Sequence, residues 1–132
     1  MVHQTRTILL VDNDAEGLDA VRELLGNWGF EVYVARTGQE ALTALTTRRP
    51  NILLIELRLP GIDGCEIIRR VRAEPTGPHP FVIAYSGCAT GPAARAAGAD
   101  AFVLKPDLES LRHLLGDPEW AGARTRKDGS ND

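Results

Sequence analysis

The sequence predicts an α/β fold in which a doubly wound parallel sheet is covered by helices on both faces. Five short apolar runs recur along the 132 residues, and each is followed by a segment with helical periodicity. Apolar runs bounded by turn residues are typical of strands buried on both faces. Because the two kinds of segment alternate, the chain predicts five βα units arranged as a three-layer sandwich.

The predicted strands are the apolar runs themselves. They are Thr7–Val11, Phe30–Ala35, Asn51–Ile55, Phe81–Tyr85 and Ala101–Leu104. The second run alternates around Val32 and Val34, which also fits a strand. The third run leads directly into an acid, Glu56, and then into a Pro-Gly turn.

The predicted helices carry apolar residues at helical spacing and end at glycine or proline. We expect them to run from Glu16 to the glycines Gly26 and Gly29, from Thr37 to a point before Pro50, from Gly64 to about Ala73, from Pro92 to Ala97, and from Leu108 to Leu115, with Gly116 just beyond the helix. Thr37 and Glu40 have the spacing of a capping box, in which each side chain bonds a free backbone N–H at the helix start.

Length and composition predict one globular domain. The chain is 43% hydrophobic with a net charge of −3, and this balance gives no electrostatic footprint for nucleic acid or an anionic membrane. No run is long enough to span a membrane, and no signal peptide opens the chain. We therefore expect a cytoplasmic domain over residues 5–118, with no direct nucleic-acid or membrane binding, and a disordered tail over residues 119–132.

Four of the five predicted strands end in polar residues. Asp12 and Asn13 follow the first strand, Glu56 follows the third, Ser86 the fourth and Lys105 the fifth. The carboxyl ends of parallel strands lie at one edge of a sheet, where ligands and chemistry gather. These side chains therefore predict a functional site at that edge.

These landmarks, taken with the turn Leu59–Gly64 and Pro106, resemble the receiver domain of two-component response regulators. The resemblance implies a CheY-like, flavodoxin-like fold with strand order 2-1-3-4-5. It also implies a role in two-component phosphorelay signal transduction rather than an enzyme activity. The expected partner is a signalling protein, either a histidine kinase or an output protein, and a homodimer stays open.

The same resemblance assigns roles to three residues that face a phosphoryl group. Glu56 stands where the family has its phosphoacceptor aspartate. Ser86 matches the hydroxyl residue that contacts the phosphoryl group, and Lys105 matches the lysine that pairs with it. We expect Lys105 and Pro106 to be joined by a cis peptide, also from the resemblance.

Four further residues match the metal and switch positions of the family. Asp12 and Asn13 stand at the acidic pair that holds Mg²⁺, and the backbone carbonyl of Arg58 would be a third metal ligand. Phe102 matches the aromatic switch residue, which acts with Ser86. Because the second member of the acidic pair is an amide here, we expect Mg²⁺ binding to be weak or absent, and no cofactor to be required.

The glutamate at position 56 leaves three interpretations open. Its carboxylate lies roughly 1.5 Å further from the backbone than that of an aspartate, and a misplacement of about 1 Å can cost ~100-fold in rate. Glu56 could imitate part of the phosphorylated state by reaching Lys105 and Ser86. It could form an ordinary ion pair with Lys105 in an atypical, phosphorylation-independent interaction module. The alternative is a functional phosphoacceptor receiver that a histidine kinase phosphorylates with Mg²⁺.

Several other polar residues have simpler interpretations. Asp14 could face a metal, but a helix cap is favoured, and Asp63 is expected to serve turn geometry. Cys65 and Cys88 lack metal or redox spacing and are expected to be reduced packing residues. His79 lies between two prolines and is expected to be solvated. A nucleotide-binding enzyme is disfavoured because no glycine-rich phosphate loop follows the first strand.

Overall fold

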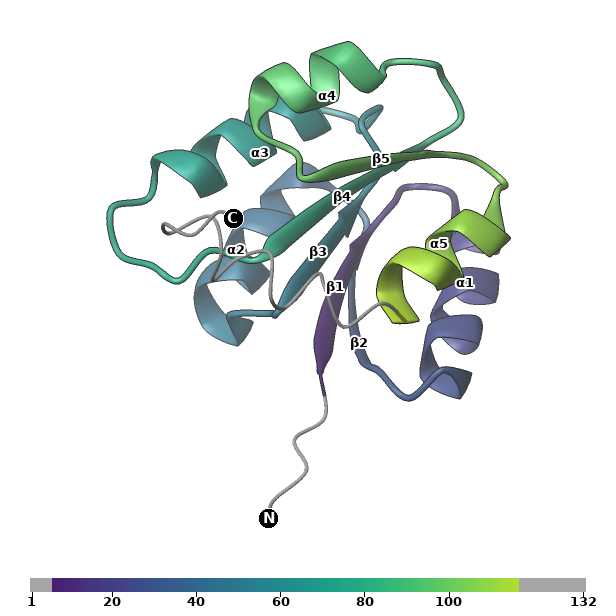
Figure 1. Ribbon diagram of the computed structural model, residues 1–132. Helices are drawn as coiled ribbons and strands as arrows, with labels where there is room; N and C mark the ends of the chain where they lie inside the picture. The colour runs from purple at the N-terminus through teal and green to yellow at the C-terminus, as the bar shows by residue number, and fades with distance from the viewer. Residues whose placement is uncertain (1–5, 117–132) are drawn as a thin grey trace, which may run out of the picture.

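The computed structural model describes residues 6–116, which form a five-stranded parallel sheet with helices on both faces (Figure 1). The strands are β1 (Thr7–Val11), β2 (Glu31–Ala35), β3 (Ile52–Ile55), β4 (Phe81–Ser86) and β5 (Ala101–Leu104). The helices are α1 (Ala15–Asn27), α2 (Gly38–Arg48), α3 (Gly64–Ala73), α4 (Gly91–Ala97) and α5 (Leu108–Gly116). The strand order is β2-β1-β3-β4-β5, so the predicted fold is confirmed.

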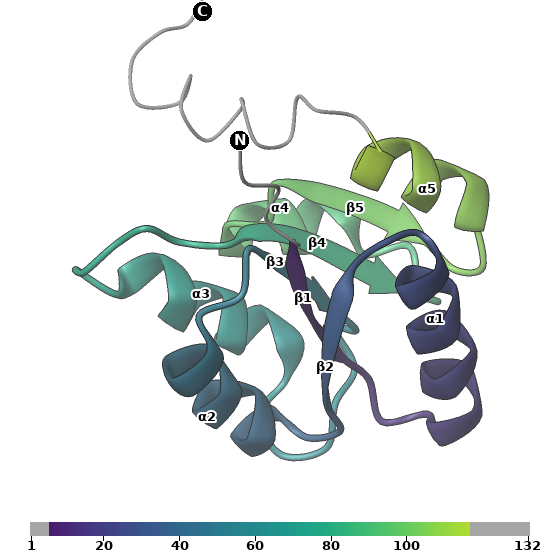
Figure 2. The ribbon, with the colours of Figure 1, turned by 90° about the horizontal axis from the view of Figure 1, so that it is seen from below.

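Alternate residues of each central strand enter two separate cores. In β1, Leu9 and Val11 face the core that includes residues of α2, α3 and α4, whereas Ile8 and Leu10 face the core beneath α1 and α5. Figure 2 shows α1 and α5 on one side of the sheet and α2 and α3 on the other. Because β1, β3 and β4 are buried on both faces, their continuous apolar sequences are explained.

A few predicted boundaries are wrong by one residue. Phe30 precedes β2 instead of opening it, Ser86 is the last residue of β4, and α4 begins at Gly91. Gly116 was expected just beyond the last helix, but it is the final residue of α5. Helix ends commonly shift by a residue because backbone hydrogen bonding, and not residue type, decides them. The predicted tail over residues 119–132 lies outside the described residues.

Side-chain caps start three of the helices, and before α5 the cap is Asp107, whose Oδ1 accepts a hydrogen bond from Ser110 N at 3.0 Å. The Thr37 half of the capping box before α2 is confirmed, since Thr37 Oγ1 accepts a hydrogen bond from Glu40 N at 3.1 Å. Glu40 Oε1 accepts a hydrogen bond from Arg36 N, one residue before the cap, at 2.8 Å. Asp63 was expected to serve turn geometry; its Oδ1 accepts a hydrogen bond from Glu66 N at 2.9 Å and so caps α3. A carboxylate here satisfies a free N–H and favours the positive end of the helix dipole.

Arg72, near the end of α3, anchors the segment that precedes β5. Its guanidinium donates to Gly98 O at 2.7 Å, to Pro80 O at 3.3 Å and to Asp100 Oδ2 at 2.6 Å. The same Asp100 oxygen accepts a hydrogen bond from Val82 N at 2.8 Å. These contacts tie the short helix α4 to α3 and β4, and so help to place β5 and the residue that follows it.

None of the helices between residues 6 and 116 is long and apolar enough to cross a bilayer.

Candidate functional site

Three of the predicted residues form an ion cluster at the carboxyl edge of the sheet. Lys105 Nζ lies 2.5 Å from Asp12 Oδ2 and 2.9 Å from Glu56 Oε1. Asp12 and Glu56 are only 6% and 8% exposed. We call these three residues the Asp12–Glu56–Lys105 cluster. One ammonium therefore serves two nearly buried carboxylates.

The sheet itself holds these residues in place. Each follows the last residue of its strand, and its backbone N–H continues the ladder by one bond. Asp12 N donates to Ala35 O at 3.1 Å, Glu56 N donates to Val11 O at 2.9 Å, and Lys105 N donates to Ser86 O at 2.8 Å. Strand pairing therefore determines the backbone positions of these residues, but it does not determine which contacts their side chains make.

The two oxygens of the Glu56 carboxylate have different partners. Oε1 pairs with Lys105, whereas Oε2 accepts hydrogen bonds from Leu57 N at 2.7 Å and Arg58 N at 3.1 Å. Ser86 Oγ accepts a hydrogen bond from Cys88 N at 3.3 Å, and the Ser86 side chain is near enough to the carboxylate to lower the pKa of Glu56. The longer side chain therefore turns one oxygen back onto the loop that follows β3.

These contacts shift the pKa values of Glu56 and Lys105 in opposite directions. Burial alone would raise the pKa of Glu56, but hydrogen bonds from Ser86, the Arg58 N–H and Lys105 outweigh it and lower the pKa. Burial would lower the pKa of Lys105, but its hydrogen bonds to Asp12 and Glu56 raise the pKa. Both shifts favour the charged forms, so the ion pair is kept at neutral pH.

The lowered pKa of Glu56 predicts a loss of stability in acid. Because the pKa is lower in the folded than in the unfolded chain, the stabilisation is complete above the ordinary value of 4.5 and is lost as the pH falls through the folded-state pKa. We expect the free energy of unfolding of Glu56→Gln, measured by urea denaturation, to fall less steeply in acid than that of the wild type. Glu109→Gln, which neutralises an exposed carboxylate, is the control and should keep the wild-type slope. If the free energy of unfolding falls equally steeply with pH in Glu56→Gln and in the wild type, this prediction is wrong.

The raised pKa of Lys105 predicts a loss of stability at high pH. Its pKa is raised, so its stabilisation is complete below the ordinary value of 10.5 and is lost as the pH rises through the folded-state pKa.

The side-chain oxygens at this site are poorly suited to bind a magnesium ion. Among residues 6–116 no three acidic, histidine or cysteine side chains gather in a way that could hold a metal ion. Asp12 Oδ2 and both Glu56 oxygens already have partners, and Asp12 Oδ1 accepts a hydrogen bond from Asp14 N at 3.1 Å. Asn13 is exposed and offers only an amide. To bind Asp12 and Glu56, Mg²⁺ would have to displace the Lys105 ammonium from both carboxylates.

A shallow hollow adjoins the cluster. Asn13, Arg58 and Asp63 line it together with Cys65 and Cys88. Both cysteines are free thiols and half-buried. Burial, more than the nearby Asp63 carboxylate, raises the pKa of the Cys65 thiol, so this thiol stays protonated at neutral pH.

The structure agrees with some of the predictions for the remaining residues and differs from others. Phe102 is half-buried and lies against Gly91, where an added Cβ would come within 3.5 Å of its ring. The Lys105–Pro106 peptide is cis as expected. Asp14 is at the cap position of α1, but its side chain makes no capping hydrogen bond. His79 was expected to be solvated; it is half-buried, and its Nε2 lies 2.7 Å from Glu74 O.

One residue beside the cluster, Tyr85, was not predicted from the sequence. Lys105 Nζ lies 5.5 Å from the centre of the Tyr85 ring, close enough for a cation–π contact. Burial, more than any neighbouring charge, raises the pKa of the Tyr85 phenol, which keeps it neutral. Tyr85 directly precedes Ser86, so an aromatic residue at a strand end was the available signal.

Comparison with known proteins agrees with this geometry. A family model described as the response regulator receiver domain matches residues 8–115. The chain belongs to this family. Receiver domains are signalling modules, and this one has the five-stranded, CheY-like arrangement of the family.

Two groups of curated relatives illustrate the match. The chain is 31% identical over 117 residues to the transcriptional regulatory protein ZraR of Escherichia coli O157:H7, which covers 87% of the chain and 26% of ZraR. It is 33% identical over 99 residues to the DNA-binding response regulator MtrA of Mycobacterium tuberculosis strain H37Rv, which covers 75% of the chain and 43% of MtrA. This receiver domain thus spans less than half the length of either relative.

Solved structures match it over nearly their full length. A signal receiver domain from Bermanella marisrubri is 30% identical with a TM-score of 0.78, covering 86% of this chain and 98% of that one. A CheY-like receiver domain from Methylobacillus flagellatus is 28% identical with a TM-score of 0.77, over the same shares of the two chains.

Proposed function

We propose that this receiver domain is a phosphorylation-independent protein-interaction module, with Glu56 in place of the phosphoacceptor aspartate. The observation that supports this most is the double engagement of the Glu56 carboxylate. One oxygen pairs with Lys105 at 2.9 Å, and the other is held by two backbone N–H groups. An acceptor for phosphoryl transfer needs an oxygen that is free to lie in line with the donor.

The same contacts explain why the domain would need no cofactor and would bind Mg²⁺ weakly. A receiver with a free acidic pocket has excess negative charge that a divalent cation can neutralise. Here the Lys105 ammonium already lies between Asp12 and Glu56. Since Asn13 brings no charge, the driving force for a second cation is reduced.

Glu56 would also reproduce part of the contact pattern of a phosphorylated receiver. It reaches the side chains of Ser86 and Lys105, the two residues assigned to the phosphoryl group by resemblance. It supplies one negative charge, whereas a phosphoryl group supplies about −1.5 to −2 and three acceptor oxygens. The imitation would therefore be partial, and the partner, a histidine kinase or an output protein, would bind without a phosphorylation step.

The proposal is tested by offering the wild-type protein a phosphoryl donor. After incubation with acetyl phosphate and Mg²⁺, we expect an unchanged intact mass and unchanged amide signals in ¹H–¹⁵N spectra. An adduct of one phosphoryl group that forms only with Mg²⁺ would overturn the proposal in favour of a functional phosphoacceptor receiver.

A second measurement separates partial imitation from a simple ion pair. If Glu56 holds the domain near an active conformation, Glu56→Gln should shift the amide signals of Phe102 and of α4 as well as those of Leu57 and Arg58. If it only forms an ion pair, the shifts should stay next to position 56.

A further inference from the structure

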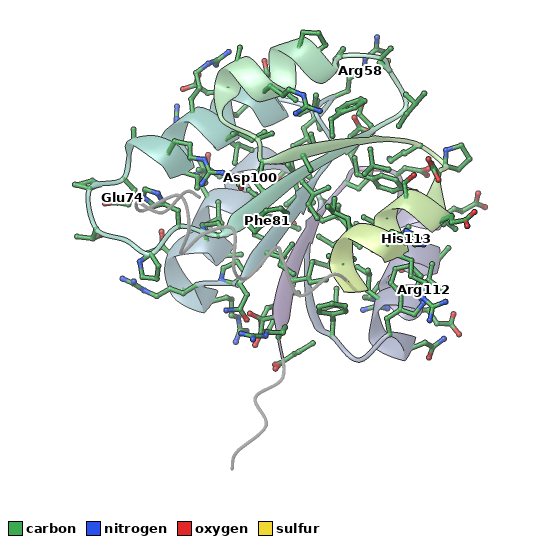
Figure 3. The ribbon with its side chains drawn as sticks, in the orientation of Figure 1. Arg58, Glu74, Phe81, Asp100, Arg112 and His113 are labelled. Atoms are coloured by element: carbon green, nitrogen blue, oxygen red, sulfur yellow. The ribbon has the colours of Figure 1, made fainter. Side chains whose placement is uncertain are left out.

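A cleft opens at the opposite end of the sheet from the ion cluster. It has a volume of about 280 Å³ and lies between the last turns of α2 and α3 and the loop over residues 74–80. Figure 3 shows Glu74 on this loop, at the far end of the sheet from Arg58, which follows β3. The cleft is thus separate from the surface where receiver chemistry takes place.

Part of the cleft lining is apolar. Leu42 and Leu45 of α2 are half-buried, and Val71 of α3 lies beside them in the lining. Three prolines complete the apolar part of the lining: Pro50, Pro78 and Pro80. Partly exposed aliphatic side chains in a concave site gain free energy when a ligand removes them from water.

Two unused donors lie on the rim. Arg49 ends α2 in the left-handed conformation, with φ of 46°, and within residues 6–116 its side chain makes no ion pair or hydrogen bond. Asn51 uses its Oδ1 to accept hydrogen bonds from Thr7 N at 2.9 Å and Thr7 Oγ1 at 3.1 Å. This leaves the amide NH₂ of Asn51 as a donor toward a ligand.

The other two charged side chains of the lining, Arg70 and Glu74, bond to neighbouring residues. Arg70 pairs with Glu66 at 3.2 Å. The Glu74 carboxylate accepts a hydrogen bond from Thr76 Oγ1 at 3.2 Å, and Glu74 O is 2.7 Å from His79 Nε2, so both polar groups of Glu74 are engaged within its own loop. Among residues 6–116, Arg49 is therefore the cation of this lining that has no partner, and the lining also contains Leu42 and Leu45.

We propose that this cleft binds a small apolar molecule that carries one carboxylate. The carboxylate would accept hydrogen bonds from Arg49 and Asn51, and the hydrocarbon part would cover Leu42, Leu45 and Val71. A guanidinium and an amide beside the apolar part of the lining match such a molecule in both charge and polarity. The volume is at the small end for ligand sites, which favours a short ligand over a peptide.

The test uses two probes of equal size, benzoate and benzamide, titrated into ¹⁵N-labelled wild-type protein. We expect benzoate to shift the amide signals of residues 42–51 and 70–80 with saturation and a dissociation constant on the order of 1 mM. Benzamide should bind roughly tenfold more weakly, because it lacks the charge that Arg49 recognises.

Two arginine variants supply the matched control. Arg49→Gln should weaken benzoate binding about fivefold to tenfold and leave benzamide binding unchanged. Arg48→Gln removes the same charge from the neighbouring residue, whose guanidinium lies 4.7 Å from the centre of the Tyr33 ring and away from the cleft, and should bind benzoate like the wild type.

Four outcomes would overturn the proposal. Absence of saturable shifts at the cleft with either probe would show that it binds no such molecule. Equal affinity for benzoate and benzamide, or equal loss in the two arginine variants, would exclude recognition of the carboxylate by Arg49. Shifts of the same amides on raising the protein concentration alone would assign the cleft to a second copy of the chain.

Discussion

The double variant Glu56→Asp, Asn13→Asp is expected to take up a phosphoryl group from acetyl phosphate at least ~100-fold faster than the wild type. The shorter acid would withdraw its oxygens from Leu57 N and Arg58 N and present one of them at the distance usual for the family. The second aspartate would restore a carboxylate for Mg²⁺, so metal affinity should rise with it. Intact mass after timed incubation measures the uptake, and calorimetric titration with Mg²⁺ measures the affinity.

Each single variant should recover only part of this effect, because acceptor geometry and metal charge act together on one transfer step. Glu109→Asp, Asn27→Asp makes the same two changes on exposed residues of helices and should behave as the wild type. If the double variant binds Mg²⁺ and takes up phosphate no better than the wild type, the block lies elsewhere in the pocket and the role proposed for Glu56 and Asn13 is wrong.

Lys105→Met is expected to lower the free energy of unfolding at neutral pH by about 3 kcal/mol. The substitution removes the one ammonium that pairs with Asp12 and Glu56, and it leaves two nearly buried carboxylates close to each other. An unpaired buried charge costs about 3–5 kcal/mol, and the partial exposure of Lys105 places this site at the lower end. Urea denaturation followed by circular dichroism measures the loss.

Two further measurements make this expectation specific. The triple variant Asp12→Asn, Glu56→Gln, Lys105→Met removes all three charges and should recover stability to within about 1 kcal/mol of the wild type. Arg69→Met, which breaks an exposed pair with Glu66, should cost less than about 0.5 kcal/mol.

The pH dependence of the free energy of unfolding of Lys105→Met is an independent test of the role of its charge. Without the ammonium, the two carboxylates repel each other, so the folded protein should bind protons more readily than the unfolded chain and gain stability as the pH falls from neutral toward 5. A loss of stability that is insensitive to pH would mean that Lys105 acts through packing of its stem and not through its charge.

The order of the elements and the position of the site at the carboxyl ends of the strands could be predicted from sequence. Continuous apolar runs are required only of strands covered on both faces, and β1, β3 and β4 are of this kind. A polar residue directly after such a run must lie at the sheet edge, because the strand pairing carries it there. This is why Asp12, Glu56, Ser86 and Lys105 could be placed together from the printed chain alone.

The contacts within the site could not be predicted in the same way. Asp12 and Lys105 are 93 positions apart, and whether one ammonium reaches one carboxylate or two depends on side-chain rotamers that no local pattern determines. The same holds for the turn of Glu56 Oε2 back onto Leu57 N and for the approach of Lys105 to the Tyr85 ring. The cap role of Asp63 was not predicted because turn and cap residues share one chemistry, and only the position of Glu66 N shows which role applies.

By itself, the sequence therefore determined the alternation of strands and helices, the residues at each strand end, and the presence of a glutamate and an asparagine among them. Hydrophobic periodicity and residue type are local properties, and they suffice for these conclusions. Only the tertiary structure decided that Lys105 pairs with both carboxylates and that a partly apolar cleft lined by Arg49 lies at the other end of the sheet. Both features depend on distances of a few ångströms between segments far apart in the chain, which close packing of the two cores sets.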